Sequence, residues 1–161
     1  MTEIFTFHSI VDSGHDFWAV SPIAFESEMQ WLVQQGYKGI SLREFYQNVD
    51  QDKVVVLTFD DGYKDFFGTV MPILNALNFS ATVFILAGLI GGFGRWREKE
   101  LRSSALLDWD EIHGAIDAGY EVGSHGLYHP EYLRLSKEEL KQEIAGSKKI
   151  IEENIKAPVV S

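Results

Sequence analysis

The segment VVVLTFDDGY, residues 54–63, is the feature of this sequence that most constrains its fold. Its first half is an apolar run rich in β-branched residues, which is typical of a strand buried on both faces of a sheet. The run ends at two adjacent acids, Asp60 and Asp61, and Gly62 then breaks the strand. A buried strand that ends in two charges is costly unless those charges have a function or partners. Because α/β proteins place their chemistry at the C-terminal ends of parallel strands, we expect this acid pair to belong to a functional site.

Length and composition indicate a single globular domain. The chain has 161 residues, of which 45% are hydrophobic and 24% are charged, as in folded rather than disordered proteins. This length suits one domain with a real core but is short for an α/β barrel. The formal net charge is −10 and no run of five basic residues occurs, so we expect no nucleic acid partner.

Several kinds of site and segment are not expected. The sequence has no cysteine, which excludes disulfides, thiolate metal ligands and cysteine nucleophiles. The N-terminal residues MTEIFTFHSI lack a basic region followed by a long apolar run, so we expect no signal peptide in this chain. No apolar stretch approaches the roughly 18–20 residues of a membrane span, so we expect no transmembrane segment.

Strand patterns alternate with helix patterns along the chain. Helices are expected after the N-cap residues Ser21, Ser41, Asp108 and Ser136, and along an apolar stripe at residues 66–77. In the last helix we expect Leu140, Ile144, Ile151 and Ile155 to form the buried stripe, and we expect residues 9–20 to form a polar loop. The strands are expected at residues 3–8, 37–40, 54–59, 81–86 and 120–124, with a further strand starting at 158–161. This alternation predicts an α/β fold with a parallel sheet and right-handed crossovers.

Polar motifs follow two of the predicted strands directly. Asp60 and Asp61 follow the strand at 54–59, and His125 and His129 follow the strand at 120–124. Since the C-terminal ends of parallel strands lie at the same edge of a sheet, these side chains can converge. One carboxylate and two imidazoles are a common ligand set for zinc or another divalent metal, and three protein ligands leave positions open for catalysis. The second carboxylate is then free to accept a proton from water.

Each motif also has a simpler structural explanation. Asp-Asp-Gly often forms only a turn, and a histidine pair four residues apart is often on the surface or at a helix cap. The position of each motif directly after a buried strand favours the metal site over these explanations.

The same residues resemble a known family. The segments at 58–63 (TFDDGY) and 124–130 (SHGLYHP) are similar to the first two motifs of the polysaccharide deacetylase family, also called the NodB-homology family or carbohydrate esterase family 4. The segments at 7–10 (FHSI) and 81–84 (ATVF) also resemble members of that family. The similarity spans essentially the whole chain, with the motifs in the family's order.

This resemblance implies a metal-dependent hydrolase that removes N-acetyl groups from an amino-sugar polymer or oligosaccharide, folded as a distorted (β/α)7-type barrel. It implies that Asp60 is the general base and that Asp61, His125 and His129 bind the divalent metal, which we expect to be zinc. An acetylated glycan is then the expected substrate.

Two features differ from the family's pattern. The position after the first histidine, usually Ser or Thr in the family, is Gly126, so a hydroxyl that would brace this loop is absent. The family's third motif, which helps to bind the oxyanion, and its general-acid histidine would follow Ser161. We therefore interpret residues 1–161 as the N-terminal part of a single catalytic domain, with the barrel incomplete at the C-terminus, and expect this chain alone to be inactive or nearly so.

Other residues are candidates for substrate binding. His8 ends the first strand at the same edge of the sheet, and Trp18 and Trp96 lie in loops from which they could stack on sugar rings. For each of them, ordinary packing is the alternative.

Two other functions remain open from the sequence. One is a non-catalytic module that binds a glycan or a metal, although a pure metal site would not need Asp60. The other is an amidohydrolase that acts on a small non-sugar amide, because a fold does not determine its substrate.

Overall fold

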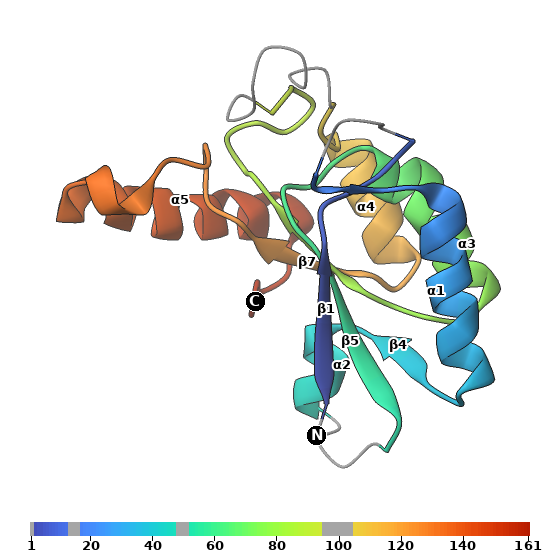
Figure 1. Cartoon of the computed structure of the whole chain (residues 1–161). Coiled ribbons are helices and arrows are strands. Elements are labelled where there is room, and N and C mark those ends of the chain that lie inside the picture. Colours follow the sequence, from blue (N-terminus) through green and yellow to red (C-terminus); the bar gives the residue numbers. More distant parts are fainter. Residues whose placement is uncertain (1, 13–16, 48–51, 95–104) are drawn as a thin grey trace.

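A five-stranded parallel sheet forms the centre of the molecule (Figure 1). The structure is a computed structural model that describes residues 2–12, 17–47, 52–94 and 105–161. All pairings within this sheet are parallel, which confirms the predicted α/β class. Its strands are β1 (Glu3–Phe7), β4 (Lys38–Ile40), β5 (Val54–Phe59), β6 (Thr82–Ile85) and β7 (Glu121–Ser124).

Strand β5 is the one around which the sheet is arranged. On one side, β1 pairs with residues 55–59 of β5. The other edge of β5 is shared by two strands, since β4 pairs with residues 54–56 and β6 pairs with residues 58–59. All six residues of β5 are buried, as the apolar run predicts for a strand covered on both faces.

Helices connect the strands, and four of them begin at the predicted caps. Asp108 and Ser136 each form a reciprocal capping box, and the Ser21 side chain accepts a hydrogen bond from the Ala24 N–H. Figure 1 shows α1, α3 and α4 on one side of the strands and α5 extending away beyond β7. In the described part of the chain, no helix is long and apolar enough to cross a membrane. The helical segments are α1 (Pro22–Gln34), α2 (Leu42–Gln47), η1 (Phe66–Val70), α3 (Met71–Ala76), α4 (Trp109–Asp117), η2 (Tyr132–Arg134) and α5 (Lys137–Ile155).

The structure differs from the prediction between the first strand and α1. Residues 9–20 were expected to form a loop, but β2 (Ser9–Ile10) and β3 (Ala19–Val20) form a small parallel sheet of their own. Asp65 attaches β2 to the start of η1, because its carboxylate accepts hydrogen bonds from the Ser9 hydroxyl (2.7 Å) and the Ile10 N–H (3.0 Å). Strands of two residues are too short to give a periodic pattern in the sequence.

The buried face of α5 also differs from expectation. Of the stripe expected to be buried (Leu140, Ile144, Ile151 and Ile155), Ile151 is buried and Ile155 packs against the core. The other buried residues of α5 are Glu143 and Ser147. Ile144 is 52% exposed. The two buried polar side chains form hydrogen bonds to β7 and to the loop that follows it, since Ser147 pairs with Ser124 and Glu143 with the backbone of that loop. Polar partners on β7 and its loop thus determine which face of the helix is buried.

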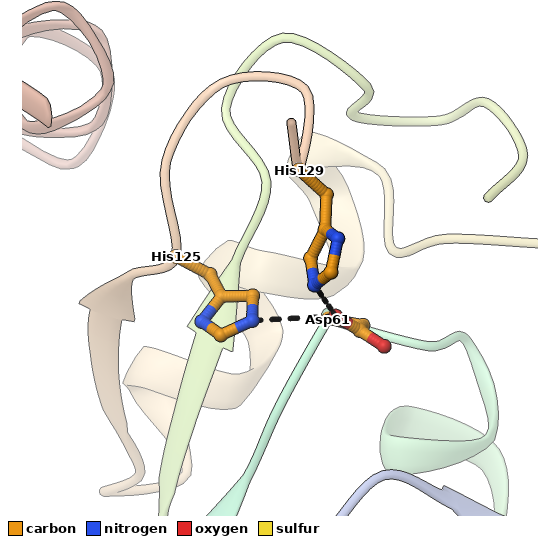
Figure 2. Close-up of side chains that lie close together, drawn as sticks. All are labelled: Asp61, His125 and His129. Carbon is orange, nitrogen blue, oxygen red and sulfur yellow. Dashed lines mark ion pairs between the residues drawn. The ribbon is translucent and has the colours of Figure 1, made fainter. Parts of the chain in front are cut away.

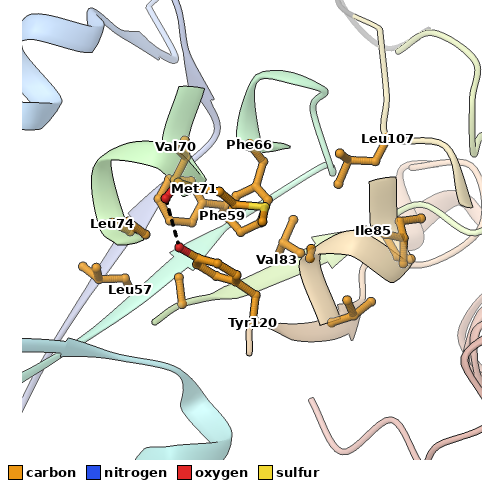
Figure 3. Packing of buried hydrophobic residues seen from close by; sticks show 14 of the residues in the cluster. Leu57, Phe59, Phe66, Val70, Met71, Leu74, Val83, Ile85, Leu107 and Tyr120 are labelled. Atoms are coloured by element: carbon orange, nitrogen blue, oxygen red, sulfur yellow. Dashed lines mark hydrogen bonds between the residues drawn. The ribbon is translucent and has the colours of Figure 1, made fainter. Parts of the chain in front are cut away.

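The core lies between the sheet and the helices (Figure 3). The ring of Phe66 in η1 packs edge-on against Phe59 of β5, with centroids 5.1 Å apart, and against Tyr120, at 5.4 Å. The Tyr120 hydroxyl donates to Asn75 Oδ1 at 2.8 Å and lies 3.3 Å from the carbonyl oxygen of Met71. The phenol therefore lies in an apolar core without losing its hydrogen bond.

The N-terminal ends of the strands carry a buried polar network. Glu121, the first residue of β7, is 3% exposed and accepts hydrogen bonds from the Thr82 hydroxyl, the Arg43 N–H and the Ser161 hydroxyl. The N–H of Leu42, at the start of α2, donates to the same Thr82 hydroxyl. This network satisfies donors at the start of α2 that have no partner within the helix.

Residues 158–161 lie beside β7 without being assigned to a strand. The Ser124 N–H donates to the carbonyl oxygen of Ser161 at 3.0 Å. The predicted start of a further strand thus makes this backbone hydrogen bond and the Ser161–Glu121 side-chain bond to β7, but it is not a strand.

Candidate metal centre

Asp60 and Asp61 lie in the turn that follows β5. The Asp60 N–H donates to the Phe7 carbonyl oxygen (2.9 Å), which extends the β1–β5 pairing by one residue. Asp61 and Gly62 have φ angles of +72° and +70°, a conformation that aspartate tolerates better than most residues with a side chain. At Gly62 a Cβ would lie 3.0 Å from Ile85 Cγ2 on β6. This turn buries Asp61, which is 2% exposed, and leaves Asp60 partly exposed.

The two histidines lie at the ends of the loop that follows β7. The His125 N–H donates to the Ile85 carbonyl oxygen (2.9 Å) and thereby continues the β6–β7 pairing. His129 has a φ angle of +58°, so the chain turns sharply at this residue. Both rings are partly exposed and their centroids are 5.3 Å apart.

The two histidine side chains converge on one oxygen of Asp61 (Figure 2). The distance from Asp61 Oδ1 is 3.4 Å to His125 Nε2 and 3.6 Å to His129 Nε2. One ligand atom from each residue lies within 4.8 Å of the other two. Ligand atoms about 2.0–2.1 Å from a tetrahedral zinc ion lie roughly 3.3–3.4 Å from one another, so the three residues fit such an ion with little movement.

The hydrogen bonding of Asp61 supports the same interpretation. Among the residues described, no donor forms a hydrogen bond with the buried Oδ1 atom of Asp61. A buried carboxylate oxygen without a donor is costly, and a cation bound between it and the two imidazoles would remove that cost. A carboxylate with two imidazoles is a ligand set suited to zinc and other divalent transition metals.

The electrostatic environment separates the two acids. Burial raises the pKa of Asp60, and the charge of Asp61 adds to this, so the pKa lies above its ordinary value in spite of the nearby imidazoles. Burial also raises the pKa of Asp61, but the interactions with His125 and His129 outweigh it and the pKa is lowered. For His125, burial lowers the pKa while Asp61 and Asp60 raise it above the ordinary value. Asp61 is thus the better anion, and Asp60 the acid whose proton affinity is closer to that of a base acting near neutral pH.

The other predicted site residues differ in position. His8 interacts electrostatically with both acids, which places it at the same end of the sheet. Its ring is 4.9 Å from that of Trp18, which is 55% exposed and packs edge-on against Phe17. Trp96, the third residue predicted to bind substrate, lies outside the described residues.

Two residues of α5 and η2 near the histidines were not predicted from the sequence. Tyr132 lines a pocket together with His125, His129 and Pro130. Glu143 is 6% exposed and accepts hydrogen bonds from the backbone between the two histidines. A glutamate within a charged helix gives no signal of burial, because most such residues face solvent.

Comparisons with known proteins agree with this geometry. A family model described as polysaccharide deacetylase matches residues 47–161. The Bacillus subtilis protein YxkH is 30% identical over 154 residues, which cover 92% of this chain and 50% of YxkH. The poly-β-1,6-N-acetyl-D-glucosamine N-deacetylase of Escherichia coli is 36% identical over 83 residues, 47% of this chain and 12% of that enzyme. The chain thus spans half or less of the length of these curated relatives.

A solved structure shows the same fold. The deacetylase PplD of Streptococcus pyogenes, in complex with acetate, matches with a TM-score of 0.83 and 25% identity, over 99% of this chain and 71% of that one. This match confirms the predicted relation to the distorted barrel of these deacetylases. Since the family model covers more than half of the chain, and both predicted motifs lie within the matched residues, the chain belongs to the polysaccharide deacetylase family.

Proposed function

We propose that this chain carries the metal-binding and base-bearing part of a carbohydrate N-deacetylase. In this proposal Asp61, His125 and His129 hold a divalent ion, most naturally zinc, and Asp60 is the general base. The observation that carries the proposal is the convergence of both imidazoles on a buried carboxylate oxygen that accepts no hydrogen bond from the residues described. A second acid lies directly beside this cluster in the sequence.

The proposed chemistry is hydrolysis of an N-acetyl group. When bound, the metal would polarise the amide carbonyl and increase the acidity of water. Asp60 takes the proton from the attacking water, a role for which its raised pKa suits it better than Asp61. Asp61 stays ionised and keeps the cluster attractive to a cation. The presence of both acids, with their pKa values moved in opposite directions, favours a catalytic site over a module that only binds.

We propose an amino-sugar polymer or oligosaccharide as the substrate. The name of the E. coli relative specifies an N-acetylated glucosamine polymer, which supports this class of substrate. The rings of Trp18 and His8 lie against each other at a tilt, 4.9 Å apart, and His8 interacts with Asp60. We assign both to the binding of a sugar ring. Aromatic side chains suit this role because they offer an apolar face with a polar edge.

We assign residues 1–161 to a single domain. Both motifs follow strands of one sheet, and β1, β5, β6 and β7 share one core. The metal ligands then come from two strand ends of the same domain and not from an interface between domains.

Metal binding is tested directly on the chain. Wild type should bind one zinc ion per chain in equilibrium dialysis with metal analysis, whereas His125→Ala and His129→Ala should lose stoichiometric binding. His113→Ala is the matched control, because it removes an imidazole on α4 that contacts Trp109 and the Asn154 carbonyl, not the cluster. Undiminished binding in both cluster variants would refute the site.

The catalytic roles are tested in the gene product that contains this chain. Asp60→Asn should keep zinc and lose acetate release from acetylated chitooligosaccharides, because it removes the base without removing a ligand. Asp61→Asn should weaken zinc binding itself. An Asp60→Asn variant with wild-type turnover would show that the base lies elsewhere.

A further inference from the structure

The two histidines are connected by only three residues. We call residues 125–129 the histidine loop. Since His125 and His129 lie at its two ends, the backbone between them determines how far apart their Nε2 atoms lie. Gly126 within the loop has a φ angle of +95° and His129 has one of +58°. A loop with two such conformations needs specific contacts to hold it.

One side of the histidine loop is held by the turn that follows β6. The carbonyl oxygen of Gly126 accepts a hydrogen bond from the Ala87 N–H, and that of Leu127 accepts one from the Gly88 N–H, both at 3.0 Å. These bonds hold the carbonyl groups of Gly126 and Leu127, whereas the N–H groups of the loop need other acceptors.

The other side is held by Glu143 of α5. One oxygen of its carboxylate, Oε1, accepts hydrogen bonds from the Leu127 N–H at 2.7 Å and the Tyr128 N–H at 2.6 Å. Both distances are short for N–H donors, as expected when the acceptor is charged. Glu143 is 6% exposed, so water competes little for these donors.

Gly126 leaves the space that the carboxylate occupies. A Cβ at this position would lie 2.7 Å from the Tyr132 hydroxyl and 3.1 Å from Glu143 Oε1. The family resemblance suggested that a missing hydroxyl leaves the loop without a brace. In this chain the carboxylate of Glu143 reaches the loop from the side where that side chain would begin.

We propose that Glu143 is a positioning residue for the metal centre, holding the histidine loop so that both imidazoles face Asp61. The proposal rests on the proposed function in one respect, namely that the cluster binds a metal. Glu143 itself would touch neither metal nor substrate and would act through the backbone of Leu127 and Tyr128.

Zinc affinity is the first measurement, made on the 161-residue chain by competition with a chromophoric chelator. Glu143→Ala should bind zinc about 10–100-fold more weakly, the usual effect of removing an outer group that orients metal ligands. Glu143→Gln keeps an acceptor oxygen in the same place but loses the charge, so it should lie between Ala and wild type. The d–d absorption of bound Co²⁺ should change in intensity in Glu143→Ala, because the ligand geometry relaxes.

Ile151→Val is the control for helix packing. Ile151 lies on the same buried face of α5, two turns further along. Its truncation loosens the helix but leaves the hydrogen bonds from Glu143 to the loop in place. Ile151→Val should keep wild-type zinc affinity and the wild-type Co²⁺ spectrum. Equal losses in this control, or wild-type affinity in Glu143→Ala, would overturn the proposal.

Amide hydrogen exchange of the metal-free chain separates the two proposals. The amides of Leu127 and Tyr128 should be protected in wild type, less so in Glu143→Gln and unprotected in Glu143→Ala, while β5 amides stay protected in each folded variant. If wild type binds no zinc but shows this pattern, the proposed function fails and loop positioning stands as a property of the fold. If exchange at these two amides does not depend on residue 143, positioning by Glu143 is refuted whatever the zinc affinity. Should Glu143→Ala fail to fold, the comparison of Glu143→Gln with wild type decides the same question.

Discussion

Glu121 should be among the most important single residues for stability, although it lies far from the metal centre. It begins β7, whereas His125 follows the end of the same strand, about 13 Å away at roughly 3.3 Å per residue. Its buried carboxylate accepts hydrogen bonds from Thr82 on β6, from Arg43 at the start of α2 and from Ser161. We expect Glu121→Ala to lower the free energy of unfolding strongly and to leave zinc affinity unchanged.

The size of this loss in unfolding free energy depends on which of the three donors can form a replacement hydrogen bond with water. A hydrogen bond to a charged acceptor contributes about 1.5–3 kcal/mol. Thr82 is completely buried, so its hydroxyl would lose its acceptor without replacement, whereas Arg43 and Ser161 are partly exposed. The Thr82 bond, lost without replacement, would cost about 1.5–3 kcal/mol, and the other two, which water replaces in part, about 0.5–1 kcal/mol each. Because the variant no longer buries a charge, we expect a net loss of about 2–4 kcal/mol. The Arg43 guanidinium adds little, because its Nε atom is 3.8 Å from the carboxylate and its side chain is 39% exposed.

Urea unfolding followed by circular dichroism at pH 7 and 25 °C measures this loss. Glu121→Gln keeps the shape and one acceptor oxygen, so it should lose only about 1–2 kcal/mol. Glu153→Ala removes an exposed carboxylate paired with Lys149 on the surface of α5 and should change stability by less than about 0.5 kcal/mol. A loss of under about 1 kcal/mol in Glu121→Ala would refute the reasoning, because the network would then be worth no more than a surface contact.

Three further predictions concern single residues. Burial raises the pKa of Glu44, but hydrogen bonds from Ser80 and the Ser41 backbone outweigh it and the pKa is lowered from 4.5. The stability that ionised Glu44 provides is therefore complete well above pH 4.5 and is lost as the pH falls through the lowered pKa. The difference in free energy of unfolding between wild type and Glu44→Gln, measured in urea, should shrink on acidification. A difference that grows would contradict this sign. Gly126→Ala should destabilise the chain by about 1–3 kcal/mol in the same assay, because φ is +95° and the new Cβ would meet the Tyr132 hydroxyl. Wild-type stability in this variant would show that the loop can adopt another conformation. In the gene product that contains this chain, Trp18→Ala should raise KM for an acetylated oligosaccharide about two- to tenfold with little change in kcat, and an unchanged KM would exclude Trp18 from substrate binding.

Local signals in the sequence were sufficient to predict most elements of the fold. The Asp108 and Ser136 caps predicted the starts of α4 and α5, because a capping box depends on residues only three positions apart. The uninterrupted apolar run predicted that β5 is buried on both faces. The division of one edge of β5 between β4 and β6 could not be predicted, since it depends on where neighbouring strands start in space.

The convergence of the candidate metal ligands was predictable for a topological reason. Strands that run parallel place their C-terminal ends together, so motifs that directly follow β5 and β7 were expected to converge, and Asp61, His125 and His129 do so. The backbone conformations that make this possible, the positive φ angles at Asp61 and His129, leave no trace in the sequence. The apolar residues of α5 predicted its buried face only in part. Ile151 is buried as expected, but the burial of Glu143 could not be predicted, because its partners lie on a different part of the chain. That this chain alone is inactive stays a prediction.

The three buried acids Asp61, Glu121 and Glu143 show why burial by itself does not identify a site. Each would be costly to bury as an unpaired charge. Glu121 accepts hydrogen bonds on both carboxylate oxygens, and Glu143 accepts two backbone N–H groups on a single oxygen. Asp61 differs, because its Oδ1 atom accepts no hydrogen bond from the described residues and faces two imidazole nitrogens that can each bind a cation. Glu121 and Glu143 therefore already have the partners that their burial requires. Asp61, in contrast, is stabilised fully only when a positive charge lies between it and the histidines. This difference in hydrogen bonding, more than the burial that all three share, separates the acid that we propose as a metal ligand from the two whose hydrogen bonds hold the fold.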